Sequence, residues 1–187
     1  MHMKWYKTGR SWVVSLLFIG LCLVAQVSSA YASPFGQGVF GADVPFGSGT
    51  SLAIALGGNV SMTLTPSGST MSGSGSHTIT VTSTDVVGYR LYIYSPTSTA
   101  LTNGSETIPA SANVSLGALA LNTWGYNTNA STNYIGVRSS PVVLKDANGP
   151  YKNGDNTTVK YGAYASVTKG AGAYTTGVVY TAVAKSQ

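Results

Sequence analysis

Short segments in which apolar and polar residues alternate recur along the chain, and this alternation limits the fold more than any other feature. In residues 86–94 (VVGYRLYIY), for example, Leu91 and Ile93 alternate with Tyr92 and Tyr94. Strict alternation is typical of a β-strand with one face in the core and the other in water. The same pattern occurs in residues 50–56, 59–65, 77–83, 156–167 and 173–184.

The segments between these candidate strands are rich in Gly, Ser, Asn and Pro, which favour turns. Residues 66–76 are expected to form a Ser/Gly turn, and residues 95–113 are expected to form a longer loop. Beyond the N-terminal region, no segment shows a convincing helical period. Seven to nine short strands separated by such turns predict an all-β domain over residues 50–187, built as a single antiparallel sandwich.

The N-terminal region predicts export from the cytosol. Basic residues at positions 4, 7 and 10 precede an almost entirely apolar run over residues 11–27, and small residues follow up to Ala32. A basic start, an apolar stretch and a small-x-small site are the parts of a secretory signal peptide. Residues 1–32 are therefore expected to form a signal-peptide helix that is cleaved after Ala32 or Ala30. The alternative is a retained membrane anchor, because the run is near the lower limit for spanning a bilayer.

Cleavage would change the composition of the chain. The single cysteine, Cys22, lies inside the predicted signal peptide. Without it the exported chain has no disulfide, thiolate metal site or cysteine nucleophile, which favours a bacterial protein over a cystine-stapled animal domain. Three of the ten Lys and Arg residues would also leave, so that seven would face five acidic residues. This small net charge argues against a nucleic-acid partner, and the predicted location is extracellular or on the cell surface.

Residues 33–49 separate the predicted signal peptide from the predicted domain. They are rich in Gly and carry Phe35, Phe40 and Phe46 at a spacing of five to six residues. Gly at this density opposes regular structure. One interpretation is a flexible lead-in whose aromatic side chains lie on the domain. The other is an arm that docks on a neighbouring copy of the chain.

Groups suited to catalysis are scarce. His77 is the one histidine expected in the exported chain, and at the start of an alternating strand it is expected to be solvated or at a sheet edge. The acidic residues form no paired-carboxylate motif of the kind used in glycoside hydrolysis. We therefore expect no enzyme activity and no cofactor. A weak candidate for calcium binding is formed by Asp146, Asn148 and Asp155, in a segment whose composition is also typical of a turn.

Aromatic residues suggest a different kind of site. Trp124 and Tyr126 would share one face of a strand, as would Tyr92 and Tyr94. Planar rings on a sheet face can stack on sugar rings when polar groups lie beside them. These four residues are therefore candidates for a glycan-binding platform. The alternative is that Trp124 belongs to the core and that the outward tyrosines are ordinary sheet surface.

The last third of the chain shows a resemblance to a known group of proteins. Residues 123–126 (TWGY), 158–162 (TVKYG) and 170–182 (GAGAYTTGVVYTA) resemble small secreted bacterial surface proteins with an Ig-like β-sandwich. The last segment is similar to the final strand of WxL-type cell-wall-binding domains and pilin-like modules, although the chain has no Trp-x-Leu tripeptide. The resemblance implies an Ig-like sandwich, a surface location and a non-enzymatic role.

These observations together predict an exported, non-catalytic bacterial cell-surface protein that acts in adhesion, envelope structure or fibre assembly. The expected partners are a component of the cell envelope or of a host surface, a glycan among them, and further copies of the chain. An exposed strand edge can accept an added strand, and Leu52, Ile54 and Leu56 are candidates for a donated strand. The alternative function is a carbohydrate-binding module that stacks sugars on Trp124 and Tyr126 or on Tyr92 and Tyr94.

Overall fold

The computed structural model describes residues 51–185, and within this range the protein is all-β, as the sequence predicted. The predicted signal peptide (1–32) and Gly-rich lead-in (33–49) lie outside the described residues. No helix occurs between residues 51 and 185, so none there is long and apolar enough to cross a membrane. The ten strands are β1 (Ser51–Leu56), β2 (Thr65–Ser67), β3 (Thr70–Thr84), β4 (Gly88–Tyr94), β5 (Leu101–Asn103), β6 (Glu106–Ile108), β7 (Thr123–Asn127), β8 (Val142–Asn148), β9 (Tyr151–Ser166) and β10 (Val179–Ala184).

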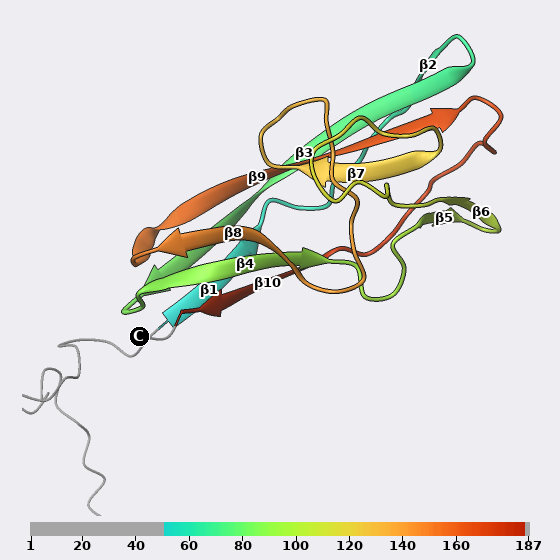
Figure 1. The fold of residues 1–187 in the computed structure, drawn as a ribbon. Helices are drawn as coiled ribbons and strands as arrows, with labels where there is room; N and C mark the ends of the chain where they lie inside the picture. The colour runs from blue at the N-terminus through green and yellow to red at the C-terminus, as the bar shows by residue number, and fades with distance from the viewer. Residues whose placement is uncertain (1–50, 186–187) are drawn as a thin grey trace, which may run out of the picture. The chain divides into compact units, whose positions relative to one another are not determined.

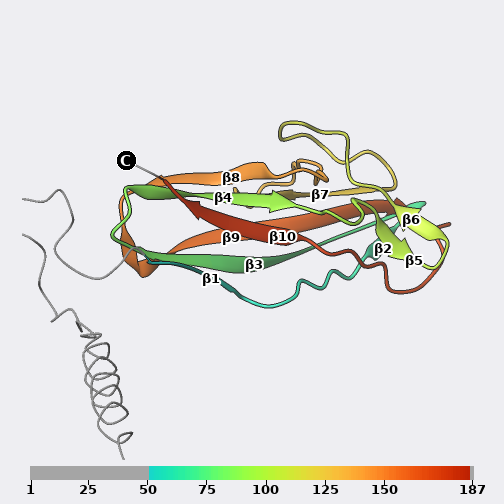
Figure 2. The same ribbon diagram turned by 90° about the horizontal axis from the view of Figure 1, so that it is seen from below.

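The strands form two main antiparallel sheets and a small hairpin (Figure 1). The first sheet has the order β1-β3-β9-β7, with β2 paired to one end of β3. The second has the order β10-β4-β8, and β5 pairs with β6. Figure 2 shows β4, β8 and β10 in one layer, and β1, β3 and β9 in the other. The domain therefore has a sandwich-like arrangement, with its core between the two main sheets.

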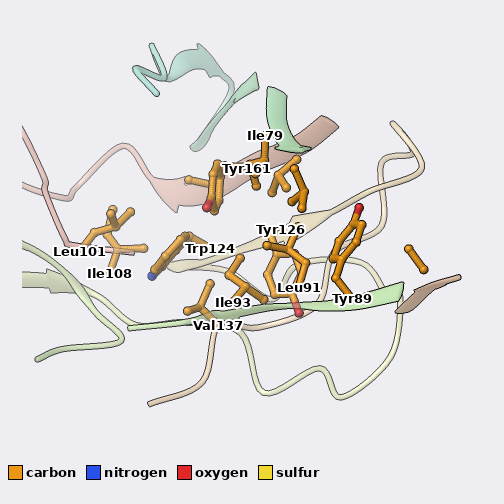
Figure 3. Close-up of a cluster of buried hydrophobic side chains, with 14 of the residues drawn as sticks. Ile79, Tyr89, Leu91, Ile93, Leu101, Ile108, Trp124, Tyr126, Val137 and Tyr161 are labelled. Atoms are coloured by element: carbon orange, nitrogen blue, oxygen red, sulfur yellow. The ribbon is translucent and has the colours of Figure 1, made fainter. Parts of the chain in front are cut away.

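The core is built from the inward side chains of both sheets. Ile79 and Val81 of β3 are fully buried, as are Tyr89 and Leu91 of β4 in the opposite sheet. Trp124 of β7 lies between the sheets, with Leu101 and Ile108 of the β5–β6 hairpin at one end of the cluster (Figure 3). Because β9 contributes buried residues at every second position, the alternation of residues 156–167 correctly predicted the buried face: Val159, Tyr161, Ala163 and Ala165.

Residues 59–65 alternate like a strand, but the prediction of a strand there is wrong. This segment crosses the inner face of β3 outside the sheet ladder, at the positions of Gly73 and Gly75. A Cβ atom at Gly73 would lie 2.2 Å from the carbonyl oxygen of Thr63, and one at Gly75 would lie 2.5 Å from that of Ser61. The two glycines are thus required by the close approach of another backbone.

The same crossing explains why residues 66–76 were wrongly predicted to be a turn. Their Ser/Gly composition is that of a loop, but they form β2, a short turn and the first half of β3. Two further predictions need correction. Residues 95–113 contain the β5–β6 hairpin, and the final strand begins at Val179 although the alternation begins near Tyr174. The β5–β6 pairing is local, whereas the bounds of the final strand are set by its pairing with β4, which is distant in the sequence.

Candidate functional site

Trp124 and Tyr126 lie in the core and not on an exposed surface. Their exposed fractions are 1% and 4%, and the Trp124 indole N–H donates a hydrogen bond to the carbonyl oxygen of Thr99 at 2.9 Å. The Trp124 ring centroid lies 6.0 Å from that of Tyr161. The prediction that these two residues form a stacking platform for sugars is therefore wrong, because no ligand can reach their faces.

Tyr92 and Tyr94 lie half-buried on the outer face of the three-stranded sheet. They are opposite Thr181 and Val179 of β10, which are exposed. A shallow hollow of about 260 Å³ lies beside Tyr92, lined also by Arg90 and Lys185. The structure thus leaves this pair of tyrosines accessible, as the glycan hypothesis requires.

Leu52, Ile54 and Leu56 lie on β1, which pairs with β3 of the same chain. They share the face of their partners on β3, Ile79 and Val81 among them, and so point to the interior. Their coverage nevertheless decreases along the strand: Leu52 is half-buried, Ile54 is 39% exposed and Leu56 is 54% exposed. β1 is the outermost strand of its sheet in the described part of the chain.

Asp146, Asn148 and Asp155 do not form a calcium loop. Asp146 pairs with Arg90 at 3.0 Å and with Lys185, and the same Lys185 ammonium donates to the Asn148 side chain at 2.8 Å. Asp155 is opposite the buried Val81 and therefore faces the interior, whereas Asp146 is opposite the exposed Arg90. Residues 51–185 contain no group of three acidic, His or Cys side chains that could hold a metal ion. The segment is the β8–β9 hairpin.

His77 belongs to a hydrogen-bonded link between the two sheets, so the prediction of a solvated or sheet-edge histidine is wrong. Its Nδ1 lies 2.9 Å from the carbonyl oxygen of Gly58, and its Nε2 lies 2.9 Å from the Tyr180 hydroxyl. Because a carbonyl oxygen only accepts, Nδ1 carries the proton in the neutral ring, and Nε2 accepts from Tyr180. Tyr180 in turn accepts from the Tyr161 hydroxyl. We call Tyr161, Tyr180 and His77 the neutral link.

The phenols of the neutral link are held in their protonated form. Burial raises the pKa of Tyr161 to about 12, although its hydrogen bond with Tyr180 acts in the opposite direction. Burial, followed by the nearby Tyr161, raises the pKa of Tyr180 well above its ordinary range. Neither ring partner of His77 is a carboxylate. The arrangement therefore joins two sheets, and it lacks the acidic partner that orients a catalytic histidine in a serine-type triad.

A second link between the sheets is ionic. Asp155 of β9 accepts hydrogen bonds from the Lys145 ammonium at 2.6 Å and from the Tyr89 hydroxyl at 2.7 Å. Lys145 and Tyr89 both belong to the other sheet. Burial, and then the hydrogen bond to Asp155, raises the pKa of Tyr89. We call these three residues the ionic link.

A second hollow, larger than the one beside Tyr92, was not predicted from the sequence. It has a volume of about 420 Å³ and lies on the outer face of the five-stranded sheet, over β3 and β9. Outward positions of β9 were visible in the alternation, which correctly placed Lys160 and Tyr164 opposite the core face. The other walls come from β3 and from the loops on either side of β7 (Figure 1), and no local pattern joins these segments.

The surface hollows and the open edge of β1 are features suited to binding and assembly, and both links serve to hold the sheets together. Comparisons of the chain with protein-family models, curated proteins and solved structures found no match.

Proposed function

We propose that the chain is an exported, non-catalytic bacterial cell-surface protein that acts in adhesion, envelope structure or fibre assembly. The proposal combines the N-terminal export pattern with an antiparallel, sandwich-like domain. It includes the finer assignment of an Ig-like sandwich, related to WxL-type and pilin-like modules, which is supported by the sequence resemblance of residues 123–182. In this proposal the domain acts by presenting strand edges, sheet faces and loops to other molecules.

The observation that carries the proposal is the incomplete coverage of β1. Ile54 and Leu56 face the same side as the fully buried Val81 and Ile79, yet 39% and 54% of their surface remains exposed. Within residues 51–185, β1 is hydrogen-bonded to a strand on one side only. A strand with a free edge and uncovered apolar side chains can pair with another chain. Association with another chain at this edge would pair the free backbone groups of β1 and cover its exposed apolar side chains.

Strand donation requires that β1 leave its own β3, and the sequence after β1 allows this. Gly57 and Gly58 follow directly, and Gly58 has a φ angle of +103°, which side-chain-bearing residues rarely adopt. A pair of glycines at this point lets the backbone change direction with little steric cost. The donated strand is therefore expected to exchange between copies as a unit, with Leu52, Ile54 and Leu56 as its apolar residues.

The test is the oligomeric state of the purified exported protein, measured by size-exclusion chromatography with light scattering. Ile54→Lys places a charge among the incompletely covered apolar side chains of β1 and should reduce association, as should deletion of residues 33–57. Val87→Lys is the matched control, since Val87 is 41% exposed and lies outside the strands. A strict monomer that neither Ile54→Lys nor the deletion changes would contradict assembly through β1.

A second candidate function is carbohydrate binding by the outer face of the three-stranded sheet. It is favoured by the accessible rings of Tyr92 and Tyr94 and by the hollow beside Tyr92. Binding to a glycan array or to isolated cell wall should be lost in Tyr92→Ala while the fold is retained. Binding that survives removal of both rings would exclude this face.

A further inference from the structure

The 420 Å³ hollow on the outer face of the five-stranded sheet has the features of a ligand site. Ser72 and Ser74 of β3 are exposed on its floor, next to Tyr164 and Lys160 of β9. Ser72 and Tyr164 are direct partners in the β3–β9 ladder. Thr132, from the loop after β7, completes this set. The volume of the hollow is within the range of about 300–1,000 Å³ typical of small-ligand sites.

The aromatic wall of the hollow is held in place by a glycine. The Tyr134 ring lies directly over Gly162 of β9. A Cβ atom at Gly162 would come within 2.3 Å of Cζ, the ring carbon that bears the Tyr134 hydroxyl. Tyr134 is only 8% exposed, so its position is fixed by packing. Tyr164, two residues further along β9, is half-buried and keeps part of its ring accessible. The hollow thus has one fixed aromatic wall and one accessible aromatic surface.

The loop that carries Thr132 is also anchored from below. Asn127, which is 1% exposed, donates its side-chain amide to the carbonyl oxygens of Ser131 at 3.1 Å and Asn133 at 2.8 Å. The Lys160 ammonium donates to Ser131 as well, at 3.1 Å. These bonds hold the wall in one conformation before any ligand arrives, and preformed sites lose less entropy on binding.

The charge of the hollow is positive and has no acidic partner within residues 51–185, although the Lys160 ammonium also lies 6.0 Å from the centre of the Tyr134 ring. Lys160 takes part in none of the four ion pairs formed within residues 51–185. Those pairs engage Glu106, Asp146 and Asp155 with other cations, and no acidic side chain lines the hollow. An anionic group beside Lys160 would form a charge-assisted hydrogen bond, which is stronger than a neutral one.

We infer that this hollow binds a saccharide that carries an acidic group, either a carboxylate or a phosphate. The accessible face of Tyr164 matches the apolar face of a sugar ring, and the hydroxyls of Ser72, Ser74 and Thr132 can donate to and accept from sugar hydroxyls. Lys160 selects the acidic group. The inference adds a ligand class to the proposed surface role. It rests on that role only in that the protein must be exported to encounter extracellular glycans.

The test is a titration of the isotope-labelled exported protein, followed by NMR. The probes are a galacturonic acid tetramer and mannose 6-phosphate, each compared with its neutral counterpart, galactose tetramer or mannose. A tetraglutamate peptide serves as a polyanion without sugar. The two acidic sugars distinguish carboxylate from phosphate as the recognised group. At least one of them should shift the backbone resonances of Ser72, Ser74, Thr132 and Tyr164 more strongly than its neutral counterpart.

Three variants and a control assign the interaction. Ser74→Tyr fills the hollow from an exposed position, and Tyr164→Ala removes the stacking ring; each should abolish binding. Lys160→Gln keeps a donor for the loop carbonyls but loses the charge, so affinity for the acidic sugar should fall about tenfold, while affinity for the neutral sugar stays the same. Val87→Ala, at an exposed position outside the strands, should bind normally.

The inference is overturned if no sugar shifts these resonances, if binding survives Ser74→Tyr, or if tetraglutamate binds as well as the acidic sugars. Equal binding of acidic and neutral sugars would overturn the role of Lys160 and with it the ligand class. Binding is measured on the folded chain whatever its oligomeric state. Failure here therefore leaves the β1 assembly experiment untouched, and the reverse is also true.

Discussion

The neutral link and the ionic link join the same two sheets by different chemistry. Val81, the ladder partner of Asp155, follows His77 by four residues on β3. The two links are therefore separated by four residues along this strand. The neutral link passes hydrogen bonds in one direction, from Tyr161 through Tyr180 to His77. The ionic link gathers two donors on one carboxylate, Asp155.

This difference shows two ways in which a core can contain polar groups. In the neutral link every member carries its own proton and no charge is buried, so the cost is limited to the desolvation of hydroxyls. In the ionic link a carboxylate with 15% of its side chain exposed depends on a lysine that is 31% exposed. Removing one member of the ionic link leaves a charge without its partner, which costs more than losing a neutral hydrogen bond.

Alkaline pH should have the largest effect, and it should act mainly on the neutral link. The pKa of Tyr161 is raised to about 12 in the folded protein, against an ordinary value near 10. Because the folded pKa is the higher one, this contribution is fully present below pH about 10 and is lost as the pH rises from about 10 to 12. Tyr161 alone should cost about 2–3 kcal/mol by pH about 12, and Tyr180 and Tyr89 should add to the loss.

Urea unfolding at several pH values between neutral and strongly alkaline measures this effect. The double variant Tyr161→Phe/Tyr180→Phe should lose stability less steeply with rising pH than the parent protein. Tyr89→Phe should flatten the curve less, because the ionic link contains one phenol and the neutral link two. Equal slopes in the parent and the double variant would show that the neutral link is not the alkaline-sensitive one.

Asp155→Ala should be the most damaging single substitution in the two links. It leaves the Tyr89 hydroxyl and the Lys145 ammonium without their shared acceptor, and Tyr89 is fully buried. The expected loss in the free energy of unfolding is about 2–4 kcal/mol. Asp155→Asn keeps an acceptor for Tyr89 and should lose less. Glu106→Ala, which removes a surface pair with Lys169, is the control, and a comparable loss there would refute the comparison.

Tyr180→Phe should have a smaller effect than Asp155→Ala. It removes the hydroxyl between Tyr161 and His77 without leaving a charge unpaired. The expected loss is about 1–2 kcal/mol, against little change for Tyr92→Phe on the outer face. Nitrogen NMR of His77 gives an independent check, since the proton should reside on Nδ1. A proton on Nε2 would reverse the direction of the link as described.

Alternation predicted the inner faces of the strands well because it is a local property. The buried side chains of β4 and β9 follow from residues two apart in the sequence. The alternation pattern failed as a predictor where a second segment of the chain packs against the strand. Residues 59–64 alternate because one side touches the core, although they cross β3 and form no ladder. The Gly residues of β3 resemble a turn in the sequence because the crossing backbone needs their space.

The sites were harder to predict, because they join residues far apart in the chain. Tyr164 and Lys160 were correctly placed outward, but Ser72 lies beside Tyr164 only through the β3–β9 register. His77 and Tyr180 are 103 residues apart, and no local pattern connects them. The burial of Trp124 was one of two alternatives in the sequence, and only the position of β7 beside β9 decides between them.

Substitution of Asp146 should have the smallest effect on the free energy of unfolding. Its comparison with Asp155 isolates the contribution of burial to the ionic link. Hydrogen bonds from Lys185 and then from Arg90 lower the pKa of this exposed carboxylate. Because its folded pKa lies below the ordinary value, any stability it contributes is present above that value and is lost as the pH falls through the lowered pKa. Solvent and salt screen the pair, so Asp146→Asn should change the free energy of unfolding far less than Asp155→Asn.

A carboxylate titration by NMR should give a low midpoint that rises in concentrated salt. If Asp146→Asn proved as damaging as Asp155→Asn, burial would not be what separates the two carboxylates, and the interior position of Asp155 would lose its significance.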